Sequence, residues 1–155
     1  MKNELKKGDT FKVDGLKYKV TAKGKVACIG ATSKKIKTVE IPATIKYKGI
    51  SYKVAAISAS AFKKYTKLKK VVIGKNITNI GKDAFSGSKA LETITFMGTK
   101  VEKIGNKAFY KIKNKAVFVI PKKKYSKYKS LISASKPSIE VEFRKTWWNI
   151  RNTKE

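Results

Sequence analysis

The side chains best suited to covalent or acid–base chemistry are scarce in this chain. It has no histidine and one cysteine, Cys28, among 155 residues. No Ser–His or Cys–His pair can form, and Cys28 lies in an apolar run that is more typical of a small core residue than of a nucleophile. Glu140 and Glu142 would share one face of a strand, but their lysine-rich surroundings favour surface ion pairs. We therefore expect no enzyme activity and no catalytic residues.

Patterns that would bind phosphate, metal or a cofactor are missing too. Gly74, Gly81 and Lys82 faintly resemble a phosphate-binding loop, but the two glycines lie seven positions apart where the loop needs about five. Asp83 also stands where that loop needs Ser or Thr for magnesium. No Cys and His spacing suits zinc, and no Asp-rich loop suits calcium. We expect no cofactor, no metal and no small-molecule substrate.

Lysine is the polar residue that dominates the chain. There are 38 basic and 10 acidic residues, a net charge of +28, and only Arg144 and Arg151 are arginine. Lysine is a mobile point charge, whereas sequence-reading nucleic-acid proteins favour the planar fork of arginine. Two interpretations stay open: a solvated surface, or nonspecific adhesion to a polyanion such as wall teichoic acid, a glycosaminoglycan or nucleic acid. The candidate polyanion contacts are Lys63, Lys64, Lys69, Lys122, Lys123 and Lys124.

The elements that must position these residues are set by a repeated phrase. Ile, then Ala-Phe four and five positions later, occurs at 57–62, 80–85 and 104–109, with a spacing of 23 and then 24 residues. A fixed period between roughly 20 and 50 residues is typical of repeat proteins. Each copy accompanies a pair of apolar residues two positions apart, which predicts a short strand with alternate side chains pointing inward. Four such pairs predict about four repeats: Val39/Ile41, Val71/Ile73, Ile94/Phe96 and Phe118/Ile120.

One repeat cannot bury its own apolar residues, so consecutive repeats must stack with equivalent strands about 4.8 Å apart. This predicts an α+β repeat solenoid of short parallel strands, with a short helical turn at each Ala-Phe pair. Equivalent residues should then form buried ladders. We expect these ladders to be Phe62/Phe85/Phe109, Ile57/Ile80/Ile104, Ala61/Ala84/Ala108 and Val39/Val71/Ile94/Phe118.

The two ends of a solenoid expose apolar surface and need caps. Residues 11–20 alternate apolar and polar around Asp14-Gly15, which predicts a β-hairpin, and a third strand should follow at 25–29. Residues 122–133 carry apolar side chains at helical spacing, and a strand is predicted at 139–143. We expect one domain, made of a hairpin cap (1–35), repeats (36–121), a helical cap (122–143) and a flexible tail (144–155) that holds Trp147 and Trp148.

The segment 68–85, LKKVVIGKNITNIGKDAF, and its copies resemble the BspA-type leucine-rich repeats of bacterial cell-surface proteins, over roughly residues 36–121. A hairpin at 41–54 fits the same pattern. In the last repeat Lys115 stands where Leu68 and Leu91 are expected, and Ile112 is the candidate to replace them. The resemblance implies a right-handed, leucine-rich-repeat-like coil and a noncatalytic module for protein–protein interaction or adhesion. It implies a secreted or cell-surface location, although no apolar run follows Met1 to serve as a signal peptide.

The same alternation also identifies the residues that should point outward from the strands. This strip carries little charge for so basic a chain, which suits a contact surface. The resemblance implies that the partner is a protein on a host or neighbouring cell, and we expect the chain to be a monomer. The alternative is that β-branched residues simply suit a half-exposed sheet. The predicted strip is Thr38, Glu40, Lys70, Val72, Thr93, Thr95, Val117 and Val119.

Overall fold

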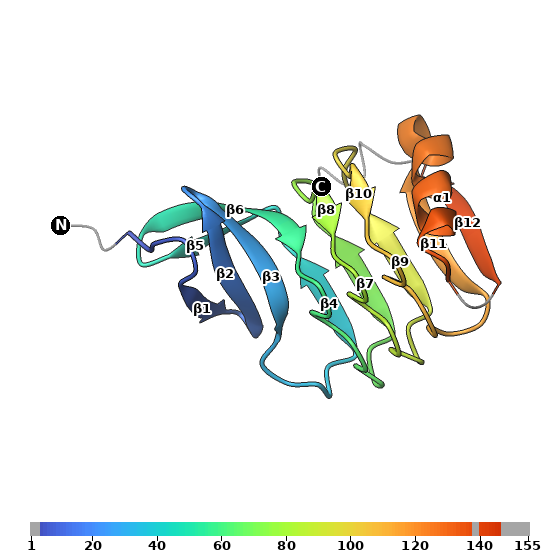
Figure 1. Cartoon of the computed structure of the whole chain (residues 1–155), viewed down its shortest axis with the longest axis horizontal. Helices are drawn as coiled ribbons and strands as arrows, with labels where there is room; N and C mark the ends of the chain where they lie inside the picture. The colour runs from blue at the N-terminus through green and yellow to red at the C-terminus, as the bar shows by residue number, and fades with distance from the viewer. Residues whose placement is uncertain (1–3, 138–139, 147–155) are drawn as a thin grey trace.

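The computed structural model describes residues 4–137 and 140–146, which form two β-sheets and one short α-helix (Figure 1). One sheet has seven strands in the order β1-β2-β3-β6-β8-β10, with β5 paired to β6, and the other has five in the order β12-β11-β9-β7-β4. Buried side chains from both sheets pack into one hydrophobic core.

The five-stranded sheet is built from one strand of each repeat. All its strands run parallel, and the register joins Val39, Val71, Ile94, Phe118 and Phe143 in a single row. The first four residues of this row are buried, as the repeat period predicts. The fifth strand extends the predicted ladder by one step, because it pairs with its neighbour in the same register. The strands are β4 (Thr38–Ile41), β7 (Lys70–Ile73), β9 (Thr93–Phe96), β11 (Ala116–Pro121) and β12 (Val141–Thr146).

The seven-stranded sheet joins the N-terminal strands to the repeats. Its first three strands are antiparallel, and the third pairs in parallel with β6, which is followed by two very short repeat strands. Asp14 and Gly15 have φ values of 48° and 83°, as expected for the tight hairpin turn predicted there. The strands are β1 (Thr10–Val13), β2 (Leu16–Ala22), β3 (Lys25–Ala31), β5 (Thr44–Tyr47), β6 (Ile50–Ile57), β8 (Asn79–Ile80) and β10 (Lys103–Ile104).

The phenylalanines of the repeated phrase form the centre of the core. The rings of Phe62 and Phe85 stack with centroids 5.3 Å apart, and those of Phe85 and Phe109 with centroids 5.5 Å apart. All three side chains are fully buried, and Ala84 and Ala108 are buried beside them. The predicted Phe and Ala ladders are therefore present, and each Phe packs against the equivalent residue of the next repeat.

The predicted helical turns at the Ala-Phe pairs are wrong. These segments are turns in which two positions per repeat have positive φ, a conformation that interrupts a helix. Their backbone N–H groups bond to the next repeat instead, as from Phe62 to the carbonyl of Ala84 at 2.7 Å. In the described part of the chain the one α-helix is α1 (Tyr125–Ala134), preceded by the 3-10 turn Lys122–Lys124. The positive-φ positions are Ser60, Asp83 and Lys107, and Lys64, Gly87 and Lys111.

The glycine of the repeated phrase is needed for close stacking. A Cβ atom added to Gly81 would lie 2.4 Å from the backbone nitrogen of Ala59, and one added to Gly105 would lie 2.4 Å from that of Lys82. Neither glycine has a positive φ, so the requirement comes from the short distance between successive repeats. The first copy of the phrase has Ser58 at this position.

The C-terminal end differs from the expectation at Ile104 and at the end of β12, and agrees with it at Ile112. Ile104 is only half-buried, because β10 is the last strand of its sheet and has a partner strand on one side alone. Ile112 is buried and Lys115 is exposed, as their types suggest. Strand β12 continues to Thr146, which pairs with Pro121. It therefore includes residues 144–146, the first three residues of the expected tail. The tail residues 147–155, including both tryptophans, lie outside the described residues.

Candidate functional site

The outer surface of the five-stranded sheet holds all eight residues of the predicted strip. The strand register arranges them in two rows, one starting at Thr38 and the other at Glu40. We call these two rows the outer face. Residues in the middle of the outer face are uncharged and half-exposed. The charged residues are Glu40, Glu142 and Arg144 at the ends of the rows, and Lys70 beside Thr38. The rows are Thr38-Lys70-Thr93-Val117-Glu142 and Glu40-Val72-Thr95-Val119-Arg144.

Met97 extends this uncharged area and was missed by the sequence prediction. It follows β9 directly, so it continues the outward alternation of Thr93 and Thr95. Its side chain is 40% exposed, and among the described residues it is the large apolar side chain that is most open to solvent. One further step of the same alternation would have identified it.

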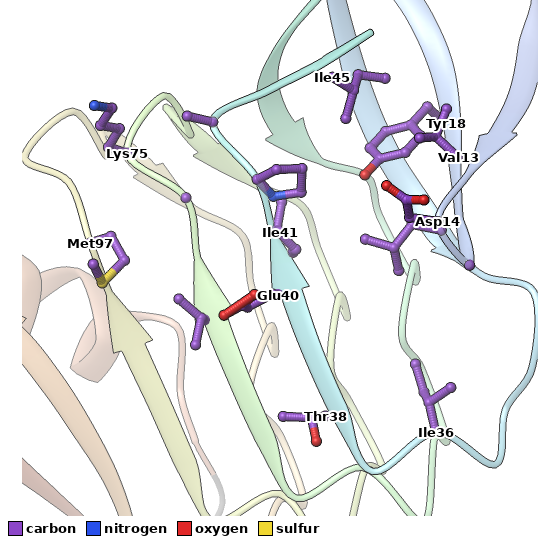
Figure 2. A pocket seen from close by; sticks show the side chains of 16 residues that line it. Val13, Asp14, Tyr18, Ile36, Thr38, Glu40, Ile41, Ile45, Lys75 and Met97 are labelled. Carbon is purple, nitrogen blue, oxygen red and sulfur yellow. The ribbon is translucent and has the colours of Figure 1, made fainter. Parts of the chain in front are cut away.

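A groove of about 1020 Å³ lies beside the outer face, between strand β4 and the turn of the β1–β2 hairpin (Figure 2). Thr38, Glu40 and Val72 line it from the sheet, and Val13 and Asp14 line it from the hairpin. The structure thus brings three residues of the predicted strip together with a turn that the sequence assigned only to a cap. Ile36, Pro42, Lys75 and Met97 also contribute to its walls.

The groove carries more acidic than basic side chains, in contrast to the chain as a whole. Asp14 and Glu40 line it, and Lys75 is its one basic residue. No ion pair involves either carboxylate within residues 4–137 and 140–146. Elsewhere lysines do reach acids, with Lys113 lying 3.0 Å from Glu92. The hydrogen bond from Lys113 holds the pKa of the Glu92 carboxyl below its usual range.

Tyr18 lies at the inner side of the groove, and its side chain is buried. Burial raises the pKa of its phenol well above the usual value, and the neighbouring ionisable groups of Cys28 and Asp14 raise it further. Figure 2 shows Tyr18 beside Asp14 and Val13 on the hairpin side of the groove. The phenol therefore stays protonated at neutral pH and can donate a hydrogen bond.

The six candidate polyanion contacts do not form one patch. Lys63 and Lys64 are exposed in the turn after Phe62, and Lys69 immediately precedes β7. Lys122–Lys124 follow the end of β11. Strands β7 and β11 run parallel in one sheet, so the residues before β7 and the residues after β11 lie at opposite ends of the strands. The candidate lysines are spread over the molecule.

The described residues form neither a metal site nor a membrane-spanning helix. No group of His, Cys, Asp and Glu side chains there is arranged to hold a metal ion. None of the helices in that part of the chain combines the length and the apolar character needed to cross a membrane.

Comparison with known proteins gives a family and a fold. A family described as "BspA type Leucine rich repeat region" matches residues 32–153 in six copies. No curated protein matches the chain. This family match extends further toward the C-terminus than the segment 36–121 that carries the resemblance, and it includes strand β12.

Solved structures with a similar fold include leucine-rich repeat proteins from three bacteria. A leucine rich cell surface protein from Faecalibacterium prausnitzii has a TM-score of 0.61 at 23% identity, covering 67% of this chain and 29% of that one. A leucine-rich repeat protein from Bacteroides ovatus has a TM-score of 0.60 at 23% identity, covering 86% and 37%. One from Bacteroides capillosus has a TM-score of 0.59 at 21% identity, covering 72% and 80%. The chain spans less than a third of the first of these proteins. With the repeat register, the stacked ladders and the family match in agreement, this chain belongs to the BspA-type leucine-rich repeat family.

Proposed function

We propose that this chain is a noncatalytic protein-interaction module of a bacterial surface protein, and that it mediates adhesion through its outer face. One observation carries the proposal: the middle of the outer face is uncharged in a chain of net charge +28. Uncharged, partly apolar surface that is half-exposed on a rigid sheet is typical of a protein contact site. The residues concerned are Val72, Thr93, Thr95, Val117 and Val119, with Met97 beside them.

A parallel sheet is a suitable support for such a contact. The register holds equivalent side chains in straight rows, and Val and Thr have few rotamers to lose when a partner immobilises them. Burial of the apolar area of the outer face against the partner would supply the favourable free energy of binding, at about 25 cal/mol per Å². Such binding depends little on salt.

The location and the overall architecture are part of this proposal. Membership of the family and the printed description of the F. prausnitzii protein support a place at the cell surface. We infer a right-handed solenoid with the N-terminal hairpin and α1 as its caps. Support for the second cap comes from Tyr128 of α1, whose hydroxyl accepts a hydrogen bond from Val101 N–H at 3.1 Å and donates one to the Gly98 carbonyl at 2.9 Å.

A second candidate function is anchoring to an anionic polymer through lysine. The net charge of +28 favours it, because a polyanion would be attracted from any direction. The scattered positions of the candidate lysines favour a diffuse attraction over a defined site. Affinity of this kind falls steeply as salt rises, since counterions are released on binding.

Capture experiments with a face variant separate the two functions. We suggest Val72→Lys combined with Thr95→Lys, and a matched control in which Lys63 and Lys64 are changed to Gln. Each protein is immobilised and exposed to bacterial wall and to host extracellular matrix at about 50 mM and about 200 mM salt. Proteins captured by the outer face should persist at the higher salt and be lost only from the face variant. Equal capture by both variants would exclude the outer face, and capture confined to low salt would favour the polymer anchor.

A further inference from the structure

Strand β4 forms an open edge of the five-stranded sheet. It is the last strand in the order β12-β11-β9-β7-β4, and β7 is its one partner strand among the described residues. The unpaired side of an edge strand presents backbone N–H and C=O groups that can pair with another chain. The groove borders this side, where Val13 and Asp14 of the hairpin line it, and it also extends over the outer face to Val72 and Met97.

The hydrogen bonds show which residues of β4 offer these groups. The carbonyl of Lys37 accepts hydrogen bonds from the N–H groups of Lys69, at 2.7 Å, and Lys70, at 3.2 Å, so it faces β7. In a strand, the backbone groups of successive residues point alternately to opposite sides. The N–H and C=O groups of Thr38 and Glu40 therefore point away from β7, into the groove that both residues line.

The side chains around this edge favour a ligand with positive charge. Glu40 lies on β4 itself, and Asp14 lines the same groove from the hairpin. Both carboxylates lack an ion-pair partner in the described part of a chain with 38 basic residues. Positive charge elsewhere on the molecule opposes a cationic ligand only weakly, because the Debye length is about 8 Å at physiological salt.

Apolar side chains complete the lining. Val13 and Ile36 line the groove beside the open edge of β4, so a ligand bound there must present apolar side chains as well as basic ones. Adjacent side chains of an extended peptide point to opposite faces. An alternation of basic and apolar residues matches that geometry, with the basic ones beside Glu40.

We propose that β4 accepts an extended peptide segment of another protein as an added strand, and that this segment alternates basic and apolar side chains. This inference rests on the proposed function, because it names the class of partner that a protein-interaction module would bind. It places the contact at one end of the outer face, where Asp14 and Glu40 recognise the basic residues.

The first test is the binding of a defined probe, the peptide acetyl-KVKVKVK-amide, to the isotope-labelled protein, followed by NMR. Shifts should concentrate at the backbone amides of Thr38, Glu40 and Asp14. Changing Asp14 to Asn and Glu40 to Gln together should weaken binding about fivefold, as expected for two charge pairs formed by exposed carboxylates. Asn suits the positive φ of residue 14, so the hairpin turn should be retained. The matched control Glu142→Gln, on the opposite edge strand, should change the affinity less than twofold.

The second test asks whether the backbone is used. N-methylation of alternate residues of the probe blocks the hydrogen bonds on one edge of the peptide. One of the two possible alternating patterns should abolish binding and the other should preserve it. Equal binding of both patterns, or shifts located away from β4, would overturn the proposal.

Three further outcomes assign a different occupant or function. Tighter binding of acetyl-EVEVEVE-amide would overturn the proposal in favour of the polyanion anchor. Light scattering that shows a dimer without peptide would mean that a second copy occupies the groove. The variant Thr95→Lys, which lies on the outer face but not in the groove, should leave the probe's affinity unchanged. If it abolishes capture of natural partners while probe binding fails in every protein, the proposed function stands and this inference does not.

Discussion

The glycines of the repeated phrase give the most direct test of how closely the repeats stack. The perturbation is the addition of one methyl group, as Gly81→Ala in one protein and Gly105→Ala in another. In each case the new Cβ would lie 2.4 Å from a backbone nitrogen of the preceding repeat, whereas ordinary contacts begin at 3.4 Å. Successive repeats would have to move apart by about an ångström at that point.

Two terms set the expected loss of stability. Forcing an extra carbon into a packed site costs about 1–3 kcal/mol, and the upper end applies because the neighbouring atoms are backbone. The N–H of Gly81 bonds to the Ile57 carbonyl at 2.8 Å, and that of Gly105 to the Ile80 carbonyl at 2.7 Å. Lengthening such a bond costs about 1 kcal/mol. Ala also lowers the conformational entropy of the unfolded chain, which stabilises the folded protein by about the same amount. We therefore expect each variant to lose about 3 kcal/mol of unfolding free energy.

Urea denaturation followed by circular dichroism measures this loss, and the thermal midpoint should fall by about 6–12 °C. The matched control is Ser58→Ala, because Ser58 occupies the same position in the first copy and already carries a Cβ. It should change the unfolding free energy by less than about 0.5 kcal/mol. If both glycine variants lose no more unfolding free energy than this control, the backbones of successive repeats do not approach closely enough to exclude a Cβ atom, and the reasoning fails.

Four other results are expected. Tyr128→Phe should lose about 1–2 kcal/mol in the same urea assay, because it leaves the buried N–H of Val101 without its acceptor; an unchanged midpoint would show that the hydroxyl is dispensable. Burial raises the pKa of the Cys28 thiol to about 12, so a thiol reagent at pH 8 should modify the folded protein at least about a hundredfold more slowly than the urea-unfolded chain, and equal rates would contradict the buried position. Since this pKa lies above the unfolded value of about 8.5, the stability it contributes is complete below about pH 8.5 and is lost as the pH rises toward 12, a decline that Cys28→Ala should reduce. The protein should bind a heparin column at about 50 mM salt, and passage straight through the column would exclude anchoring to an anionic polymer as its function.

The core could be predicted from the sequence because the repeat period fixes the register. Once Phe62, Phe85 and Phe109 are aligned, stacking alone makes them neighbours, and no long-range information is needed. The conformation of the turns that follow could not be predicted in this way. Lys64 and Lys111 adopt the same positive φ as Gly87, and two lysines give no sequence signal for it. Hydrogen bonding to the adjacent repeat overrides their local preference for a helix.

For a similar reason, only part of the candidate site could be predicted from the sequence. Alternation along a strand identifies outward residues such as Val72 and Thr95, since it depends on neighbours in sequence. The groove depends on where the β1–β2 hairpin lies relative to β4, two segments that belong to different sheets. Nothing in the local pattern around Asp14 indicates that it lines the same groove as Glu40.

The direction of the hydrogen bonds between repeats has a mechanical consequence. Each repeat in the core of the fold bonds to the repeat before it and the repeat after it, through strands such as β7 and β9 and through turns such as those of Phe62 and Phe85. These bonds run along the stacking direction, so a pull on the two ends of the chain would load the repeat interfaces in series. The weakest interface would open first, and each repeat released would add about 80 Å of extended chain. Such a fold would lengthen in steps under tension, and the interfaces that remain would keep their packing.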